Sequence, residues 1–420
     1  MNKIILKEAF SIRNNLKQLF IRPSDNYAFI DGCRAVAVLY VVVFHCFWLP
    51  QYFVSENVFL NYLNSFPKYL IWIWNAHIVV DIFFVISGFL IAGQLMREFR
   101  NCETLDIKRF YIRKFSRIAP AYVLALFAFS LLISDHHFNK IWTNLLFVNN
   151  FLPAKKMFMP HSWFLAIEGQ FYLVVPVFML FVFFKTRYKL ASLISLFFIS
   201  LIVRFILCRT DNSLLSTPFY HFFFLGLSGG SLDYYESMYI NFYTRYGALI
   251  CGMISAYLHV YYSEKLVSFF RNRTITASVI MILAVVLNAV ILFIPLHDPE
   301  INFSQSFMLI YIVAARNIFC LGIAFMILFA LYQIKSGNFI IRFLSCKFWY
   351  PVAQLSFSVY LFHYMIVLTL YKIITSAGKM QNISVLQIGG VTLGVTFLTL
   401  FLSAVVYLAV EKPILNMLKK

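Results

Sequence analysis

The sequence predicts an all-α polytopic membrane protein with about ten transmembrane helices and both termini in the cytoplasm. Hydrophobic residues make up 61% of the 420 residues, and charged residues make up only 12%. Soluble domains carry about 25% charged residues, so this chain is too apolar to be one of them. Its formal net charge of +18 comes from short basic clusters between apolar runs. That pattern is typical of cytoplasmic loops and argues against nucleic acid as a partner.

Ten apolar runs approach the length of about 20 residues that crosses a bilayer as a helix. They cover residues 29–48, 77–96, 118–134, 163–184, 190–207, 245–262, 274–294, 307–332, 351–373 and 385–410. With the N-terminus inside, these spans leave most Lys and Arg on the cytoplasmic side. An eleventh span at 214–232 would move two basic clusters to the outside, against the positive-inside rule.

The segment 214–232 is therefore expected to be re-entrant or interfacial, within a long outer loop at 209–243. Pro218 and the glycines at 226, 229 and 230 interrupt its apolar run. Irregular backbone at membrane depth is tolerated only where it lines protein or a cavity.

The whole chain is expected to form one membrane domain. Residues 1–27 mix basic and apolar side chains without the apolar core of a cleavable signal, which predicts a cytoplasmic amphipathic segment. Residues 28–413 form the transmembrane domain, and residues 414–420 form a cytoplasmic tail. The seven cysteines are scattered, without metal-ligand spacing. We therefore expect no metal site and no disulfide framework.

The first span, FIDGCRAVAVLYVVVFHC, carries Arg34 and His45. Eleven residues bring both side chains to one helix face, about 16 Å apart along the axis. Ionisable residues within spans are costly and usually functional. The alternatives are that Arg34 reaches the inner headgroups or pairs with Asp31, and that His45 binds a backbone carbonyl at the outer interface.

Two carboxylates are expected at a depth similar to that of His45. Asp81 lies near the outer end of the second span, and Glu168 lies within about two turns of the outer end of the fourth. Either carboxylate beside an imidazole would orient it and raise its basicity. Ser87 and Gly88, in the second span, permit close contact between helices.

A basic inner loop, REFRNCETLDIKRFYIRKFSRIAP, precedes the third span. Arg113, Lys114 and Arg117 stand at its end and suit either phosphates or anionic lipid headgroups. At the predicted outer surface, His161, Trp163, Arg245 and His363 are further candidates for substrate binding. The polar residues thus divide by side, with cations inside and a His, Glu, Asp and Arg set outside.

These residues carry a family resemblance. The chain resembles the acyltransferase-3 family of integral membrane O-acyltransferases, such as bacterial O-antigen and exopolysaccharide O-acetyltransferases, from residue 29 to residue 413. Six blocks occur in order: Arg34 and His45 separated by ten residues, DIFFVISGFLI, RKFSRIAP, SWFLAIEGQFYLVVP, SFSVYLFHYMIV and a terminal EKPI. Lys114 stands where the family commonly has arginine, which keeps the charge but loses a bidentate fork.

The resemblance implies transfer of an acyl group, usually acetyl from cytoplasmic acetyl-CoA, to a glycan or glycolipid hydroxyl at the outer face of the bacterial inner membrane. Under this hypothesis Arg34, Arg113, Lys114 and Arg117 hold the phosphates, and the pantetheine arm threads the interior toward His45. His45 takes the hydroxyl proton. Direct transfer and a transient acyl-histidine both fit. Many relatives carry a C-terminal SGNH domain, and a step that needs such a domain is expected to occur on the membrane domain or on a separate periplasmic partner.

The competing class is a transporter of a lipid-linked glycan or a small molecule, in which the same charges form a permeation path. Ten spans and a basic mouth suit that class equally well. The sequence shows no matched pair of interrupted helices and no internal repeat, which disfavours it.

Overall fold

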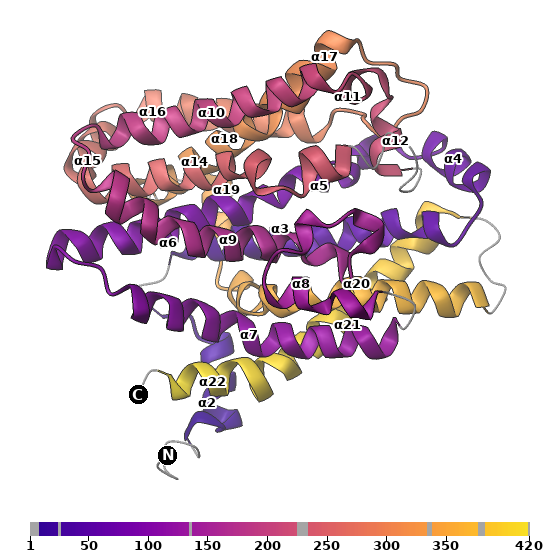
Figure 1. Ribbon diagram of the computed structural model, residues 1–420, viewed down its shortest axis with the longest axis horizontal. Coiled ribbons are helices and arrows are strands. Elements are labelled where there is room, and N and C mark those ends of the chain that lie inside the picture. The colour runs from indigo at the N-terminus through magenta and orange to yellow at the C-terminus, as the bar shows by residue number, and fades with distance from the viewer. Residues whose placement is uncertain are drawn as a thin grey trace.

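The computed structural model describes residues 8–23, 27–133, 137–224, 234–333, 338–376 and 383–418, and within these ranges all regular secondary structure is helical. Figure 1 shows the long helices running side by side across the view. They are α3 (Ala28–Trp48), α6 (Asp81–Cys102), α7 (Ile107–Leu132), α9 (Trp163–Phe178), α10 (Lys189–Thr210), α14 (Phe242–Tyr261), α16 (Thr274–Leu292), α18 (Arg316–Tyr332), α20 (Trp349–Ser376) and α21 (Val385–Val406). The predicted all-α polytopic class is confirmed.

Shorter elements cap this bundle or extend its helices. They are α2 (Ile12–Phe20), η1 (Leu49–Tyr52), α4 (Glu56–Asn64), η2 (Lys68–Asn75), α5 (Ala76–Val79), η3 (Phe138–Lys140), α8 (Ile141–Leu145), η4 (Asn149–Phe151), η5 (Ala154–Lys156), η6 (Pro160–Ser162), η7 (Met179–Phe183), α11 (Ser213–Ser216), α12 (Phe219–Phe224), η8 (Tyr235–Tyr239), α15 (Ser263–Asn272), α17 (Gln305–Ile310), η9 (Tyr311–Ala315), α19 (Phe339–Leu344), η10 (Tyr407–Glu411) and α22 (Lys412–Met417).

In the described part of the chain, nine helical segments are long and apolar enough to cross a membrane. The remaining expected span, 245–262, is α14, a helix of 20 residues. It packs among α6, α10 and α18 and buries most of its side chains. A helix surrounded by protein has little contact with lipid, so its sequence can be more polar than that of an outer span.

Segments expected on one side of the membrane gather at one end of the bundle. In Figure 1, α15 lies at the left end, while α4 and α12 lie at the right end. The first and last helices of the described residues, α2 and α22, lie near each other, and the Asn416 side-chain amide donates a 2.9 Å hydrogen bond to Asn15. We use "inner end" for the α15 end, which the charge pattern predicts to be cytoplasmic.

Two expectations for the connecting segments change in detail. The basic inner loop is largely helical: α6 continues to Cys102, a turn follows, and α7 begins after Asp106, whose carboxylate accepts from the Arg109 amide. The basic residues of α7 are therefore held rigidly on one helix. In the outer segment, α11 and α12 are short helices on either side of Thr217 and Pro218. Residues 225–232 of the expected re-entrant segment lie outside the described residues.

Helices α6 and α14 approach each other closely at two glycines. A Cβ atom on Gly88 would lie 2.1 Å from the Leu249 carbonyl oxygen, and one on Gly252 would lie 2.0 Å from the Val85 carbonyl oxygen. Only glycine fits such backbone contacts, which small residues commonly provide between membrane helices. Gly88 thus has the packing role that the sequence indicates.

Replacing Gly252 with alanine should lower the free energy of unfolding by about 1 to 3 kcal/mol, because the added methyl forces two backbones apart. Thermal unfolding in detergent measures the effect. Gly389→Ala on α21 is the matched control, since a Cβ there would meet nothing within 4 Å. Equal stability of the two variants would contradict the close packing of α6 against α14.

Candidate active site

A cavity of about 120 Å³ lies among α3, α6, α7, α9 and α20, and we call it the basic cavity. Its polar lining consists of Arg34, Ser87, Lys114, Arg117, Glu168, Tyr172, Ser356 and Tyr360. Arg34 donates a 2.9 Å hydrogen bond to the Ser356 hydroxyl. Asp31, one alternative partner for Arg34, instead lies 3.3 Å from Nε of Arg22. The Arg34 guanidinium therefore faces the cavity.

The basic cavity carries excess positive charge. Among the described residues, no carboxylate lies within ion-pair distance of Arg34, Lys114 or Arg117. The Lys114 ammonium lies 5.9 Å from the centre of the Tyr172 ring, a cation–π contact. Glu168 also lines the cavity, where its carboxylate accepts a 2.5 Å hydrogen bond from Ser87. Three cations against one carboxylate favour a polyanionic ligand.

Arg113 lies apart from the basic cavity. It is exposed and lines a separate hollow with Lys108 and Arg109 near the start of α7. Arg109, Arg113 and Arg117 recur every four residues, so they form one row along α7 that spans about 12 Å. The row leads from the inner end of the helix toward the basic cavity.

His45 lies on α3 beyond Arg34, and its polar side-chain partner is another histidine. His363 Nδ1 lies 2.7 Å from the Tyr360 carbonyl oxygen and therefore carries a proton. Its Nε2 is then an acceptor, 3.2 Å from His45 Nδ1. His45 Nδ1 also lies 2.9 Å from the Val41 carbonyl oxygen. These acceptors assign the proton of His45 to Nδ1, which leaves Nε2 with a free lone pair.

A second cavity, of about 370 Å³, surrounds His45, and we call it the aromatic cavity. Eight aromatic side chains of the described residues line it: Phe44, Trp48, Tyr52, Trp163, Tyr235, Tyr239, Tyr360 and Tyr364. His161 and the exposed Lys155 also line it. Burial raises the pKa of the Tyr235 phenol well above its usual range. It therefore stays protonated and can donate to an oxygen atom of a ligand.

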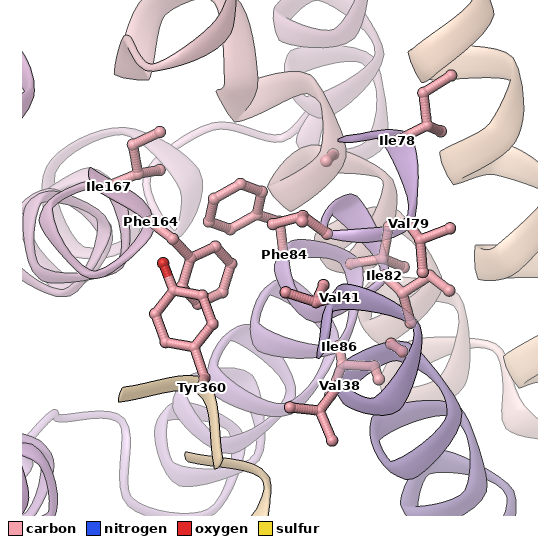
Figure 2. Close-up of a cluster of buried hydrophobic side chains, with 14 of the residues drawn as sticks. Val38, Val41, Ile78, Val79, Ile82, Phe84, Ile86, Phe164, Ile167 and Tyr360 are labelled. Atoms are coloured by element: carbon pink, nitrogen blue, oxygen red, sulfur yellow. The ribbon is translucent and has the colours of Figure 1, made fainter. Parts of the chain in front are cut away.

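The two cavities meet at one side chain. Among the described residues, Tyr360 alone lines both. Its hydroxyl donates to the His161 carbonyl oxygen. In Figure 2 the Tyr360 ring lies beside Phe164, and Phe84 lies beyond Phe164. The expected interior path from Arg34 to His45 is therefore closed in this structure by an apolar partition.

Neither expected carboxylate orients His45. Glu168 is bound to Ser87 in the basic cavity. Asp81 is buried between two arginines, with Oδ1 lying 2.7 Å from Arg245 and Oδ2 lying 3.0 Å from Arg316. Glu168 thus lies with Arg34 in the basic cavity, whereas His45 lines the other cavity, so the expected similar depth of Glu168 and His45 was wrong. The structure gives His45 a histidine partner in their place.

The arrangement around Asp81 also places Arg245 away from the aromatic cavity. The Arg245 guanidinium lies 4.9 Å from the Trp163 ring and 4.3 Å from the Tyr239 ring, behind two of the side chains that line the cavity. Arg245 is fully buried. It thus supports the cavity wall and does not itself line the cavity.

Replacing Asp81 with asparagine should lower the free energy of unfolding by about 3 to 5 kcal/mol, because it leaves two buried guanidinium groups without a counter-charge. Thermal unfolding of the detergent-purified protein measures the loss. Asp211→Asn is the control, since in the described residues the Asp211 carboxylate bonds only to nearby Ser213. Unchanged stability of the Asp81 variant would contradict the structural role.

The remaining candidates fall around the aromatic cavity. Trp163 and His161 line it, and His161 stacks on Tyr364 with ring centres 4.6 Å apart. His363 is buried behind His45. Sequence analysis missed Tyr360 and Ser87 as site residues. The helical spacing of Tyr360, His363 and Tyr364 on α20 could have indicated one shared face.

The fold and the site define a polytopic membrane protein with a cation-lined cavity backing onto a histidine in an aromatic cavity. The chain belongs to the acyltransferase-3 family, because the family's acyltransferase domain matches residues 27–408. That match covers both cavities. No solved structure matches the chain.

The similar proteins include three from Haemophilus influenzae and Staphylococcus aureus. A Haemophilus influenzae protein whose name states no function is 37% identical over 159 residues, which are 34% of this chain and 62% of that protein. A Staphylococcus aureus protein provisionally named an O-acetyltransferase is 33% identical over 180 aligned residues. This alignment covers 38% of this chain and 26% of the Staphylococcus protein. The O-acetyltransferase OatA of Staphylococcus aureus is 25% identical over 361 aligned residues. This alignment covers 80% of this chain and 50% of OatA. The matches thus span only part of each relative's length.

Proposed function

We propose that the protein is an O-acetyltransferase that moves an acetyl group from cytoplasmic acetyl-CoA to a hydroxyl of a cell-envelope glycan or glycolipid at the outer face of a bacterial inner membrane. One observation carries the proposal: a cavity with three cations and a cavity with an imidazole lie in sequence along α3 and meet at Tyr360. Family membership and the names of the relatives support acyl transfer as the reaction.

The basic cavity suits the donor. Coenzyme A carries a pyrophosphate and a 3′-phosphate, and charge-assisted hydrogen bonds to such groups are strong. We assign Arg34, Lys114 and Arg117 to the phosphates, with Arg113 guiding the nucleotide from the inner end of α7. Anionic headgroups of membrane lipids are the competing ligand for the exposed Arg113. Glu168, held by Ser87, can accept hydrogen bonds from amide groups of the pantetheine arm.

The length of the donor fits the separation of the two cavities. A pantetheine arm extends about 15 to 20 Å at ordinary covalent geometry. Arg34 and His45 are about 16 Å apart along α3. A phosphate near Arg34 therefore allows the thioester to reach the level of His45.

The aromatic cavity suits a sugar acceptor. The apolar faces of sugar rings pack well on flat aromatic side chains, and the hydroxyl groups need donors and acceptors around the edge. Trp163 and Tyr364 supply flat surfaces, whereas Lys155 and the phenols of Tyr235 and Tyr239 supply polar groups. A cavity of about 370 Å³ is within the range of small-ligand sites.

His45 would act as the general base. Its free Nε2 takes the proton of the sugar hydroxyl as the oxygen attacks the thioester carbonyl carbon. The carbon–sulfur bond then breaks, and the CoA thiolate takes the proton back from the imidazolium. His363 positions His45, because its Nε2 accepts from His45 Nδ1 and stabilises the imidazolium. Catalysis of this kind typically contributes about 10²- to 10⁴-fold.

The test uses detergent-purified protein with acetyl-CoA, with and without glycan or glycolipid extracted from the cell envelope. We expect release of free CoA thiol together with an acetylated acceptor identified by mass spectrometry, and little release without acceptor. A transporter would release no thiol under either condition, which would contradict the proposal. Adding a soluble periplasmic fraction shows whether a separate partner completes the transfer.

A further inference from the structure

Tyr360 stands where the two cavities meet. It lies on α20 between Ser356, which lines the basic cavity, and Tyr364, which lines the aromatic cavity. Its hydroxyl donates to the His161 carbonyl oxygen, and its ring centre lies 5.2 Å from that of Phe164. The side chain is 8% exposed. Tyr360 therefore closes the gap between α20 and α9 at this depth.

The partition around Tyr360 is apolar. Phe164 stacks on Phe84 of α6, with ring centres 4.6 Å apart at 22°. On α3, Val38 and Val41 occupy the turns between Arg34 and His45, and both are buried. In Figure 2, Val38 and Val41 of α3 lie to the right of the Tyr360 and Phe164 rings. Such a layer excludes water and separates the two halves of the site.

The partition matters because water competes with the acceptor. A thioester that is open to the outer cavity beside a general base would be hydrolysed as well as transferred to a sugar. Hydrolysis has the same balance as transfer: a water oxygen attacks the carbonyl carbon, the carbon–sulfur bond breaks, and acetate and the CoA thiol leave. Some element must therefore keep the acetyl group from His45 until an acceptor hydroxyl is in place.

We propose that Tyr360 is a gate that admits the acetyl group to His45 when an acceptor fills the aromatic cavity, and that it thereby selects a sugar hydroxyl over water. This inference rests on the proposed acetyl transfer. Turning the side chain breaks a single hydrogen bond to a backbone carbonyl. An acceptor in the aromatic cavity contacts the Tyr360 ring and therefore interacts differently with the closed and the open rotamer of this side chain. Such a difference is what shifts the population from one rotamer to the other.

The experiment compares Tyr360→Ala and Tyr360→Leu with the wild-type protein in detergent, using acetyl-CoA alone. We expect release of CoA thiol and acetate without acceptor to rise about tenfold in both variants, because either smaller side chain opens the partition. Tyr360→Phe keeps the ring and loses the hydrogen bond to His161, so its hydrolysis should rise only about two- to threefold.

Tyr371→Ala is the matched control. Tyr371 lies on the same helix, is also buried and donates a 2.6 Å hydrogen bond to the Cys46 carbonyl oxygen, but lines neither cavity. The Tyr371→Ala protein should hydrolyse acetyl-CoA at the wild-type rate. Retained binding of acetyl-CoA identifies the folded variants.

The gate is refuted if folded Tyr360→Ala or Tyr360→Leu hydrolyses acetyl-CoA no faster than a wild-type protein that does acetylate its acceptor. Equal acceleration by Tyr371→Ala would also refute it, since loosening of α20 would then be the cause. A wild-type protein that transfers nothing would overturn the proposed function and not the gate alone.

Discussion

Replacing His45 with alanine or glutamine should reduce acetylation of the acceptor by about 10²- to 10⁴-fold, the usual contribution of a general base. The binding of acetyl-CoA should remain, because the donor groups line the other cavity. The measurement is the rate of acceptor acetylation at saturating acetyl-CoA, together with the donor concentration for half-maximal rate.

His259→Gln is the matched control for His45→Gln. His259 lies on α14, lines neither cavity and hydrogen-bonds the Tyr332 hydroxyl at 3.0 Å. The His259→Gln protein should acetylate the acceptor at the wild-type rate. Full activity of a folded His45→Gln protein would remove His45 from the mechanism.

Two variants of His363 test whether this residue positions His45 or only fills space. His363→Gln retains a side-chain oxygen that can accept from His45 Nδ1, whereas His363→Leu does not. If His363 positions His45, the glutamine variant should keep more activity than the leucine variant, and the pH profile of the rate should shift in the latter. Identical profiles would indicate that His363 only fills space.

Much of this arrangement was predictable because membrane helices translate sequence position into depth. Composition gave the fold class, and the eleven-residue interval placed Arg34 and His45 on one face of α3. The structure has them lining successive cavities. Depth follows from a constant rise per residue, so it can be read from one sequence.

The rotation of each helix about its axis is harder to predict. Asp81 and Glu168 were both expected beside His45, yet Asp81 turns toward Arg245, and Glu168 bonds to Ser87 in the basic cavity. Which faces meet depends on how helices pack, and this is set by small contacts such as Gly252 against Val85. The pairing of His45 with His363 also required α3 and α20 to be neighbours. No local pattern in a single sequence fixes that neighbourhood.

Reversing charges in the basic cavity should strongly raise the KM for acetyl-CoA. The double substitution Lys114→Glu and Arg117→Glu should raise the KM for acetyl-CoA by about 10²-fold or more, because a hydrogen bond to a charged group contributes about 1.5 to 3 kcal/mol. The rate at saturating donor should change much less, since the reacting imidazole lies across the partition. Steady-state kinetics over a wide range of acetyl-CoA concentration separates the two parameters.

Arg271→Glu with Arg273→Glu controls for general attraction of an anion to the inner end, since both residues are exposed and line neither cavity. This pair should leave the KM within about twofold, because exposed charges are screened by salt. Arg113→Glu tests the row along α7: a rise in KM between those of the two pairs would place the nucleotide along that row. If reversing the charges of Lys114 and Arg117 leaves the KM for acetyl-CoA unchanged, these cations bind lipid headgroups, and the donor must bind elsewhere.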